Sequence, residues 1–91
     1  MNREDLKLVI EMLESEKPSD AQLLFDKIPK QQNVEYFLVK GKLEQKFQRW
    51  GEAINAFLKV IEMEPNNSEA QNNLQIIHNI LNFWSPEMFN P

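Results

Sequence analysis

Residues 51–65 read GEAINAFLKVIEMEP, and this stretch decides the fold. Its small and apolar residues Ala53, Ala56, Phe57 and Val60 recur at intervals of three and four, the spacing of one face of an α-helix. Pro65 follows the pattern, and proline cannot continue a helix interior. The stretch therefore predicts an amphipathic helix whose buried face carries these residues.

An earlier segment carries the same pattern. Residues 20–28 (DAQLLFDKI) match residues 52–60 (EAINAFLKV) in an acid, an alanine, a phenylalanine, a lysine and a β-branched aliphatic residue, in the same order and 32 residues apart. Ala21 and Phe25 stand where Ala53 and Phe57 stand in the later copy. Similarity within one chain at a period of about 20 to 50 residues is typical of repeat proteins, in which each unit buries its apolar face against the next.

The apolar spacing predicts five helices in all and no strand. The first helix stops near Ser15, and its apolar face consists of Leu6, Val9, Ile10 and Leu13. The second begins at Ser19, whose spacing to Gln22 is that of a capping box. Pro29 closes the second helix, because the residue before a proline is disfavoured in the helical conformation.

The third and fifth helices complete the pattern. Asn33 is expected to cap the third helix, which runs to about Phe47 with Phe37, Leu38 and Gly41 on one face. An interior glycine costs about 1 kcal/mol relative to alanine, so we expect Gly41, together with Ala53, to permit a close approach of the third and fourth helices. The fifth helix is capped by Asn66 or Ser68, ends before Pro86, and carries a stripe of Ala70, Leu74, Ile77 and Leu81.

Together these residues resemble a tetratricopeptide repeat. The resemblance covers the segment from Phe37 to Pro65 and rests on Phe37, Gly41, Ala53, Phe57, Val60 and Pro65 at their mutual spacings. It implies an all-α fold in which antiparallel helix hairpins stack as a short right-handed superhelix of five helices. A generic helical bundle is the alternative.

The resemblance also implies how a single domain over residues 1–91 is divided. Residues 1–32 form a degenerate first repeat, residues 33–67 a full repeat, residues 68–83 a capping half-repeat helix and residues 84–91 a C-terminal tail. Two positions depart from the family pattern, because Lys40 stands where a leucine is usual and Glu44 where an aromatic residue is usual.

Such repeats bind a peptide or a protein surface in a concave groove lined by the first helix of each repeat. The resemblance places the groove residues of the third helix at Glu35, Leu38, Lys42, Gln45 and Lys46. Lys42, Lys46 and Arg49 follow a spacing of i, i+4 and i+7, so they predict a basic stripe that would bind an acidic or carboxylate-bearing segment. The alternative is a solvated charged helix face.

One subclass of the family binds the carboxylate-terminated tails of chaperones through Lys, Asn, Asn, Lys and Arg. The matching positions here hold Leu6, Ile10, Val39, Glu69 and Asn73. These residues cannot form the same carboxylate clamp, so the sequence disfavours a chaperone-tail adaptor.

The chain closes on FWSPEMFNP (residues 83–91), an apolar segment interrupted by Pro86. One interpretation is a cap over the apolar face of the fifth helix. The other is that Trp84, Met88 and Phe89 contact a partner or a second copy. The oligomeric state expected from the sequence is a monomer or a weak homodimer.

Composition argues against several other classes of protein. The net charge of −4 disfavours nucleic-acid binding, and the absence of cysteine excludes disulfides and zinc–thiolate sites. His78 is the single histidine and has no companions at the spacing of a metal site or a catalytic triad. We therefore expect no catalytic activity, metal or cofactor. No apolar run resembles a signal peptide or a membrane span, so the expected location is the cytoplasm.

Overall fold

The computed structural model describes residues 3–84, and this part of the chain consists of five helices with no strand. They are α1 (Arg3–Glu14), α2 (Pro18–Asp26), α3 (Val34–Lys46), α4 (Trp50–Met63) and α5 (Ser68–Trp84). The predicted all-α class with five helices is confirmed. None of the helices described combines the length and the apolar character that a membrane span requires.

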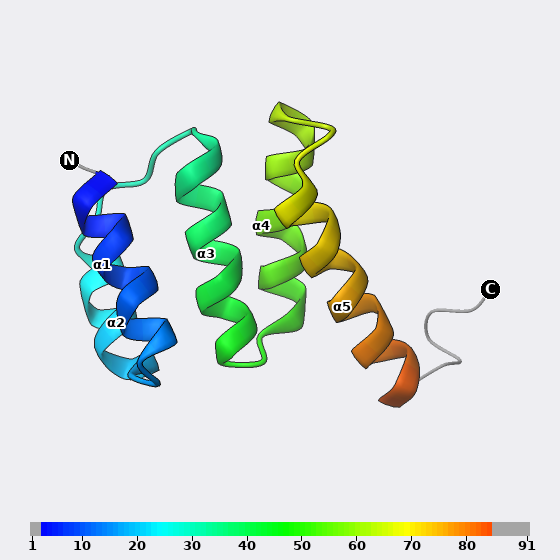
Figure 1. Cartoon of the computed structure of the whole chain (residues 1–91), viewed down its shortest axis with the longest axis horizontal. Helices are drawn as coiled ribbons and strands as arrows, with labels where there is room; N and C mark the ends of the chain where they lie inside the picture. The colour runs from blue at the N-terminus through cyan, green and yellow to red at the C-terminus, as the bar shows by residue number, and fades with distance from the viewer. Residues whose placement is uncertain (1–2, 85–91) are drawn as a thin grey trace.

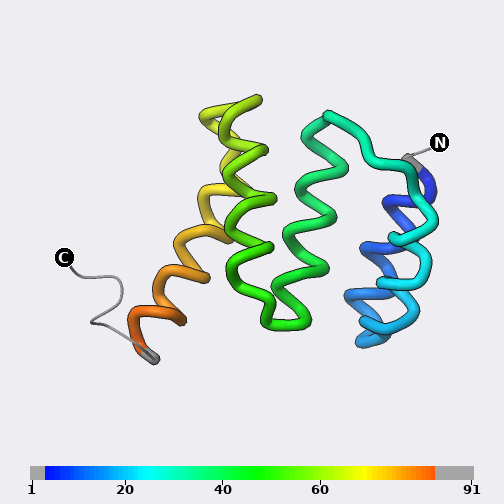
Figure 2. The backbone as a smooth tube through the Cα atoms, turned by 180° about the vertical axis from the view of Figure 1, so that it is seen from behind, coloured from blue at the N-terminus to red at the C-terminus, as the bar shows by residue number. Residues whose placement is uncertain are grey.

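Consecutive helices run in opposite directions along an elongated body of 42 × 27 × 18 Å (Figure 1). α1 and α5 lie toward the viewer in Figure 1, whereas α2 and α4 are nearest in Figure 2, which is seen from behind. The even-numbered helices therefore occupy one side of the body, and α1 and α5 occupy the other.

The 32-residue period of the sequence recurs in the backbone. α1 ends at Glu14 and α2 begins at Pro18, and α3 and α4 end and begin 32 residues later, at Lys46 and Trp50. Each turn contains one residue with positive φ, Glu16 at 59° and Gln48 at 60°. In each turn the next amide donates a hydrogen bond back across the helix end, from Lys17 N to Met12 O at 2.8 Å and from Arg49 N to Glu44 O at 2.9 Å. A helix end with one residue in the left-handed conformation and a hydrogen bond from the next amide to the carbonyl five residues back is a Schellman-type cap. This cap occurs at the ends of both α1 and α3, 32 residues apart.

The duplicated core residues are buried at equivalent positions. Ala21 and Ala53 are fully buried, as is Phe57, and Phe25 is nearly so. Two apolar clusters result, the first among α1, α2 and α3 and the second between α4 and α5. Phe37 is half-buried and packs against both clusters, so it links the two halves of the core.

The α3–α4 contact depends on Gly41. A Cβ atom at position 41 would lie 2.6 Å from Cε1 and Cζ of the Phe57 ring, well inside van der Waals contact. The ring therefore occupies the space that any other side chain at this position would need. The sequence prediction that Gly41 serves close helix packing agrees with this geometry.

Several local predictions were wrong. The second helix begins at Pro18, with Lys17 as its N-cap residue and no side-chain cap, and it ends at Asp26, before Pro29. Proline is well suited to the first helical position because its fixed φ is already helical and its missing N–H needs no partner there. The predicted capping box of Ser19 and Gln22 therefore lies inside the helix.

The predicted caps of α3 and α5 had different outcomes. Asn33 caps α3, and its Oδ1 accepts a hydrogen bond from Tyr36 N at 2.8 Å. α5 is capped by neither predicted residue, because Asn67 Oδ1 accepts from Ala70 N at 2.8 Å and Ser68 is already helical.

The core face of α3 was also misassigned in part. Tyr36 and Val39 are buried, whereas Phe37 and Leu38 are half-buried.

Replacing Gly41 tests the close contact directly. We expect Gly41→Ala to destabilise the protein by about 1 to 3 kcal/mol, because the added Cβ would overlap the fully buried Phe57 ring and force it to shift. Gly51→Ala is the matched control, since an added Cβ there meets nothing within 4 Å. It should be neutral or stabilising by up to about 1 kcal/mol. Urea unfolding of both variants measures the difference, and equal effects would contradict the packing role of Gly41.

Phe57→Ala should cost on the order of 3 to 5 kcal/mol, because it opens a cavity at the centre of the α3–α4 contact. This is a large part of the stability of a small domain. Thermal unfolding would show a large decrease in Tm. A decrease of only a degree or two would mean that the side chain contributes little to the core.

Candidate functional site

The candidate site is a groove lined by α1, α3 and α5. It consists of two adjoining hollows, which share Ile10, Lys42 and Glu69 and have volumes of about 320 and 360 Å³. The first hollow is lined by Leu6, Lys7, Ile10, Glu35, Leu38, Val39, Lys42 and Glu69. The second is lined by Ile10, Leu13, Glu14, Lys42, Lys46, Glu69 and Asn73. We call the two hollows together the inner groove.

Helical periodicity brings the α3 residues into the inner groove. Glu35, Leu38, Lys42 and Lys46 are separated by three or four residues, so they lie along one side of α3. The structure places the first three at the first hollow and Lys46 at the second.

Two residues predicted for the groove lie elsewhere. Gln45 is half-buried and lines neither hollow. Arg49 lies beyond the end of α3, so the predicted i, i+4, i+7 stripe does not continue to it. Its side chain instead contacts Glu44 and Gln22, and its guanidinium lies 4.5 Å from the centre of the Phe47 ring.

Both lysines of the inner groove form ion pairs within the chain. Lys42 pairs with Glu69, which joins α3 to the first turn of α5. Lys46 Nζ lies 3.1 Å from Glu16 Oε2 in the turn between α1 and α2. The first pair is partly shielded from solvent, but the Glu16 side chain is largely exposed, so the second pair contributes little to stability. An acidic ligand would have to compete with these carboxylates.

The floor of the inner groove is apolar. Leu6 and Ile10 from α1 face Leu38 and Val39 from α3 across the first hollow. The five positions that the resemblance aligns with a carboxylate clamp do meet around this groove, but four of them are aliphatic or acidic. The inner groove therefore suits an apolar side chain better than a terminal carboxylate.

Sequence reasoning missed the buried carboxylate of Glu44. This residue is only 9% exposed and is held from two sides, by Lys40 Nζ at 2.9 Å and by Arg49 Nε at 2.5 Å. Arg49 Nη2 also donates to Gln22 Oε1 at 2.5 Å, so the network reaches α2. Burial disfavours the ionised carboxyl, but the hydrogen bonds and positive charges of Lys40 and Arg49 outweigh it and lower the pKa of Glu44. The Lys40–Glu44 spacing of i, i+4 was the available signal.

The predicted tail contacts cannot be placed. Trp84 is the last residue of α5, and Met88 and Phe89 lie outside the described residues. Over residues 3–84 the structure brings together no group of three or more histidine, aspartate or glutamate side chains suited to hold a metal ion.

Comparison with known proteins returned no matching family model, no matching curated protein and no matching solved structure.

The Glu44 network predicts a pH-dependent contribution to stability. Because the pKa of Glu44 is lower in the folded state, its contribution is complete above the unfolded value of about 4.5 and is lost as the pH falls through the folded value. Glu44→Gln should therefore destabilise the protein by about 1 to 3 kcal/mol at neutral pH. The difference in Tm from the wild type should shrink as the pH is lowered below 4.5.

Glu62→Gln is the control for this experiment. Glu62 also forms an ion pair, with Lys59 at 3.7 Å, but both side chains are exposed. Its substitution should change stability by no more than about 1 kcal/mol. Equal losses of stability in the two variants would show that the burial of Glu44 adds nothing to the stabilising effect of its ion pairs.

Proposed function

We propose that this chain is a small tetratricopeptide-like interaction module that binds a protein or peptide in the inner groove without catalysis. The observation that carries the proposal is the groove itself, with an apolar floor between α1 and α3 and charged residues along its rim. An apolar floor supplies affinity by burying surface, and charged groups at the rim orient the ligand.

The internal repetition supports the proposed repeat architecture. The helix boundaries, the two positive-φ turn residues and the buried Ala–Phe pairs all recur 32 residues apart. Three helices, α1, α3 and α5, contribute to one groove. This is the arrangement expected when helix hairpins stack in register, and a stack of this kind presents an extended binding face.

The charges of the inner groove define the proposed ligand further. Lys42 and Lys46 are held by Glu69 and Glu16, and Lys7 adds a third positive charge on the α1 side. An acidic residue of the ligand can form an ion pair with Lys42 or Lys46 only by displacing the chain's own carboxylates. We therefore propose a segment in which a large apolar side chain enters the first hollow and a neighbouring acidic residue replaces Glu69 at Lys42.

Selection from a random peptide library tests this function. The purified chain should enrich peptides that pair an apolar residue with an adjacent acid. Their affinity should fall at least about tenfold for Lys42→Glu, a loss of about 1.4 kcal/mol. Lys59→Glu is the matched control, because it makes the same charge change at an exposed lysine on α4 that does not line the groove.

The double variant Lys42→Glu with Glu69→Lys separates binding from folding. It reverses the ion pair between α3 and α5 and so preserves their attraction. A peptide that needs the positive charge at position 42 should still bind weakly. Full affinity for Lys42→Glu would remove Lys42 from the binding site. Restoration by the double variant would mean that the acidic residue of the ligand pairs with a lysine at either position, since both positions line the two hollows.

A further inference from the structure

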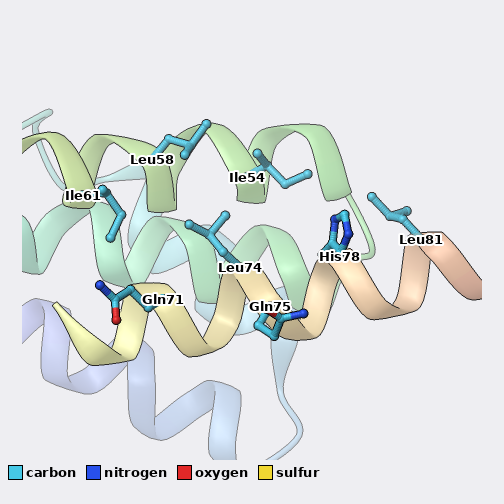
Figure 3. A pocket seen from close by; sticks show the side chains of 8 residues that line it. All are labelled: Ile54, Leu58, Ile61, Gln71, Leu74, Gln75, His78 and Leu81. Atoms are coloured by element: carbon cyan, nitrogen blue, oxygen red, sulfur yellow. The ribbon is translucent and has the colours of Figure 1, made fainter. Parts of the chain in front are cut away.

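A second groove lies on the opposite side of α5, between α5 and α4. It has a volume of about 580 Å³ and is lined by Ile54, Leu58, Ile61, Gln71, Leu74, Gln75, His78 and Leu81. Figure 3 shows Leu74, His78 and Leu81 extending from α5 toward α4, with Ile54, Leu58 and Ile61 facing them. We call this the outer groove.

The outer groove lies beside the last helix of the described residues. α3 is covered by α4, whose Phe57 ring packs onto Gly41. No helix that follows α5 is present within the described residues to cover its corresponding side. α5 diverges from α4 toward its C-terminal end (Figure 1), and Leu58 remains 47% exposed.

The outer groove carries no formal charge when His78 is neutral. No aspartate, glutamate, lysine or arginine occurs between Glu69 and Glu87, although such residues make up 26% of the chain. Depletion of charged residues is the compositional mark of the core of a protein–protein interface.

The net charge of the chain restricts the faces through which two copies can associate. Two copies of a chain with a net charge of −4 repel each other, and this repulsion is weakest between faces that carry no charge. A two-fold dimer brings the same surface patch of both copies together, so this patch must be complementary to itself. Leucine and isoleucine side chains bury against each other, and the amides of Gln71 and Gln75 offer both a donor and an acceptor. The outer groove, whose lining carries no formal charge when His78 is neutral, meets this requirement.

We propose that the outer groove is a homodimer interface, in which α5 of one copy packs against α4 and α5 of a second copy. This interface lies on the far side of α5 from Glu69 and the inner groove. It does not depend on peptide binding, and it involves described residues of α4 and α5 rather than residues 85–91.

Sedimentation equilibrium of the full chain tests the proposal, over a concentration range from about 1 μM to about 1 mM that covers weak association. The wild type should convert from monomer to dimer within this range. Leu58→Glu should raise the dissociation constant at least about tenfold, because it places like charges in a buried interface. Leu23→Glu is the matched control, since Leu23 is an exposed leucine of α2 (64%) outside the groove. It should dimerise as the wild type does.

Gln75→Glu provides a second, milder substitution in case Leu58→Glu perturbs the fold, which far-UV circular dichroism would detect. It should also weaken the dimer. Hydrogen exchange should show added protection in α5 at high concentration. A wild type that stays monomeric throughout the range would overturn the proposal. Unchanged dimerisation of both folded variants, or binding of a different protein at this groove without self-association, would do the same.

Discussion

The ring of Phe57 lies on the backbone of Gly41, in space that any side chain at position 41 would occupy. This contact sets how closely α3 approaches α4, and α3 also forms one wall of the inner groove. Phe37, four residues before Gly41, packs against both apolar clusters and therefore joins the two halves of the core. A change in the α3–α4 distance would alter both the core and the wall that carries Leu38 and Lys42.

Polar contacts add a second connection between the two helix pairs. Arg49 begins α4 as its N-cap residue, bonds to Glu44 near the end of α3 and reaches Gln22 on α2. The left-handed conformation of Gln48 makes this possible, because it turns the chain so that Arg49 comes back beside Glu44. Apolar packing alone leaves the rotation of neighbouring helices loosely defined, whereas a buried carboxylate that must keep two hydrogen-bond partners is satisfied in few arrangements. The network is therefore well placed to fix the register of α2 against α3 and α4.

The sequence predicted features that depend on local spacing. The apolar periodicity located all five helices, the duplicated Ala–Phe pattern identified residues that are buried at equivalent positions, and the cap at Asn33 was placed correctly. Prediction from the sequence failed where several neighbouring residues share the same apolar character or the same suitability as a helix cap. Tyr36, Phe37, Leu38 and Val39 are consecutive and apolar, so spacing alone does not say which two are most buried. Asn66, Asn67 and Ser68 are all good caps, and only the path of the chain selects Asn67.

The candidate site was predictable to a smaller extent, because it depends on contacts between distant residues. Lys42 and Lys46 were read as a basic stripe, yet their partners Glu69 and Glu16 come from α5 and from an earlier turn. Charges that look unopposed along one helix are opposed once the helices pack. The same holds for Glu44, whose partner Arg49 is brought back by the conformation of the turn rather than by helical spacing.

The two grooves use opposite sides of the same helix. The first turn of α5 faces the inner groove, where Glu69 pairs with Lys42, and Leu74, His78 and Leu81 farther along face the outer groove. A ligand in one groove does not occupy the other, so a proposed dimer through α5 would still present two inner grooves. Each groove also has the composition that its proposed partner requires. Charged rim residues select among different ligands, whereas a face without charge allows two identical acidic chains to meet with the least repulsion.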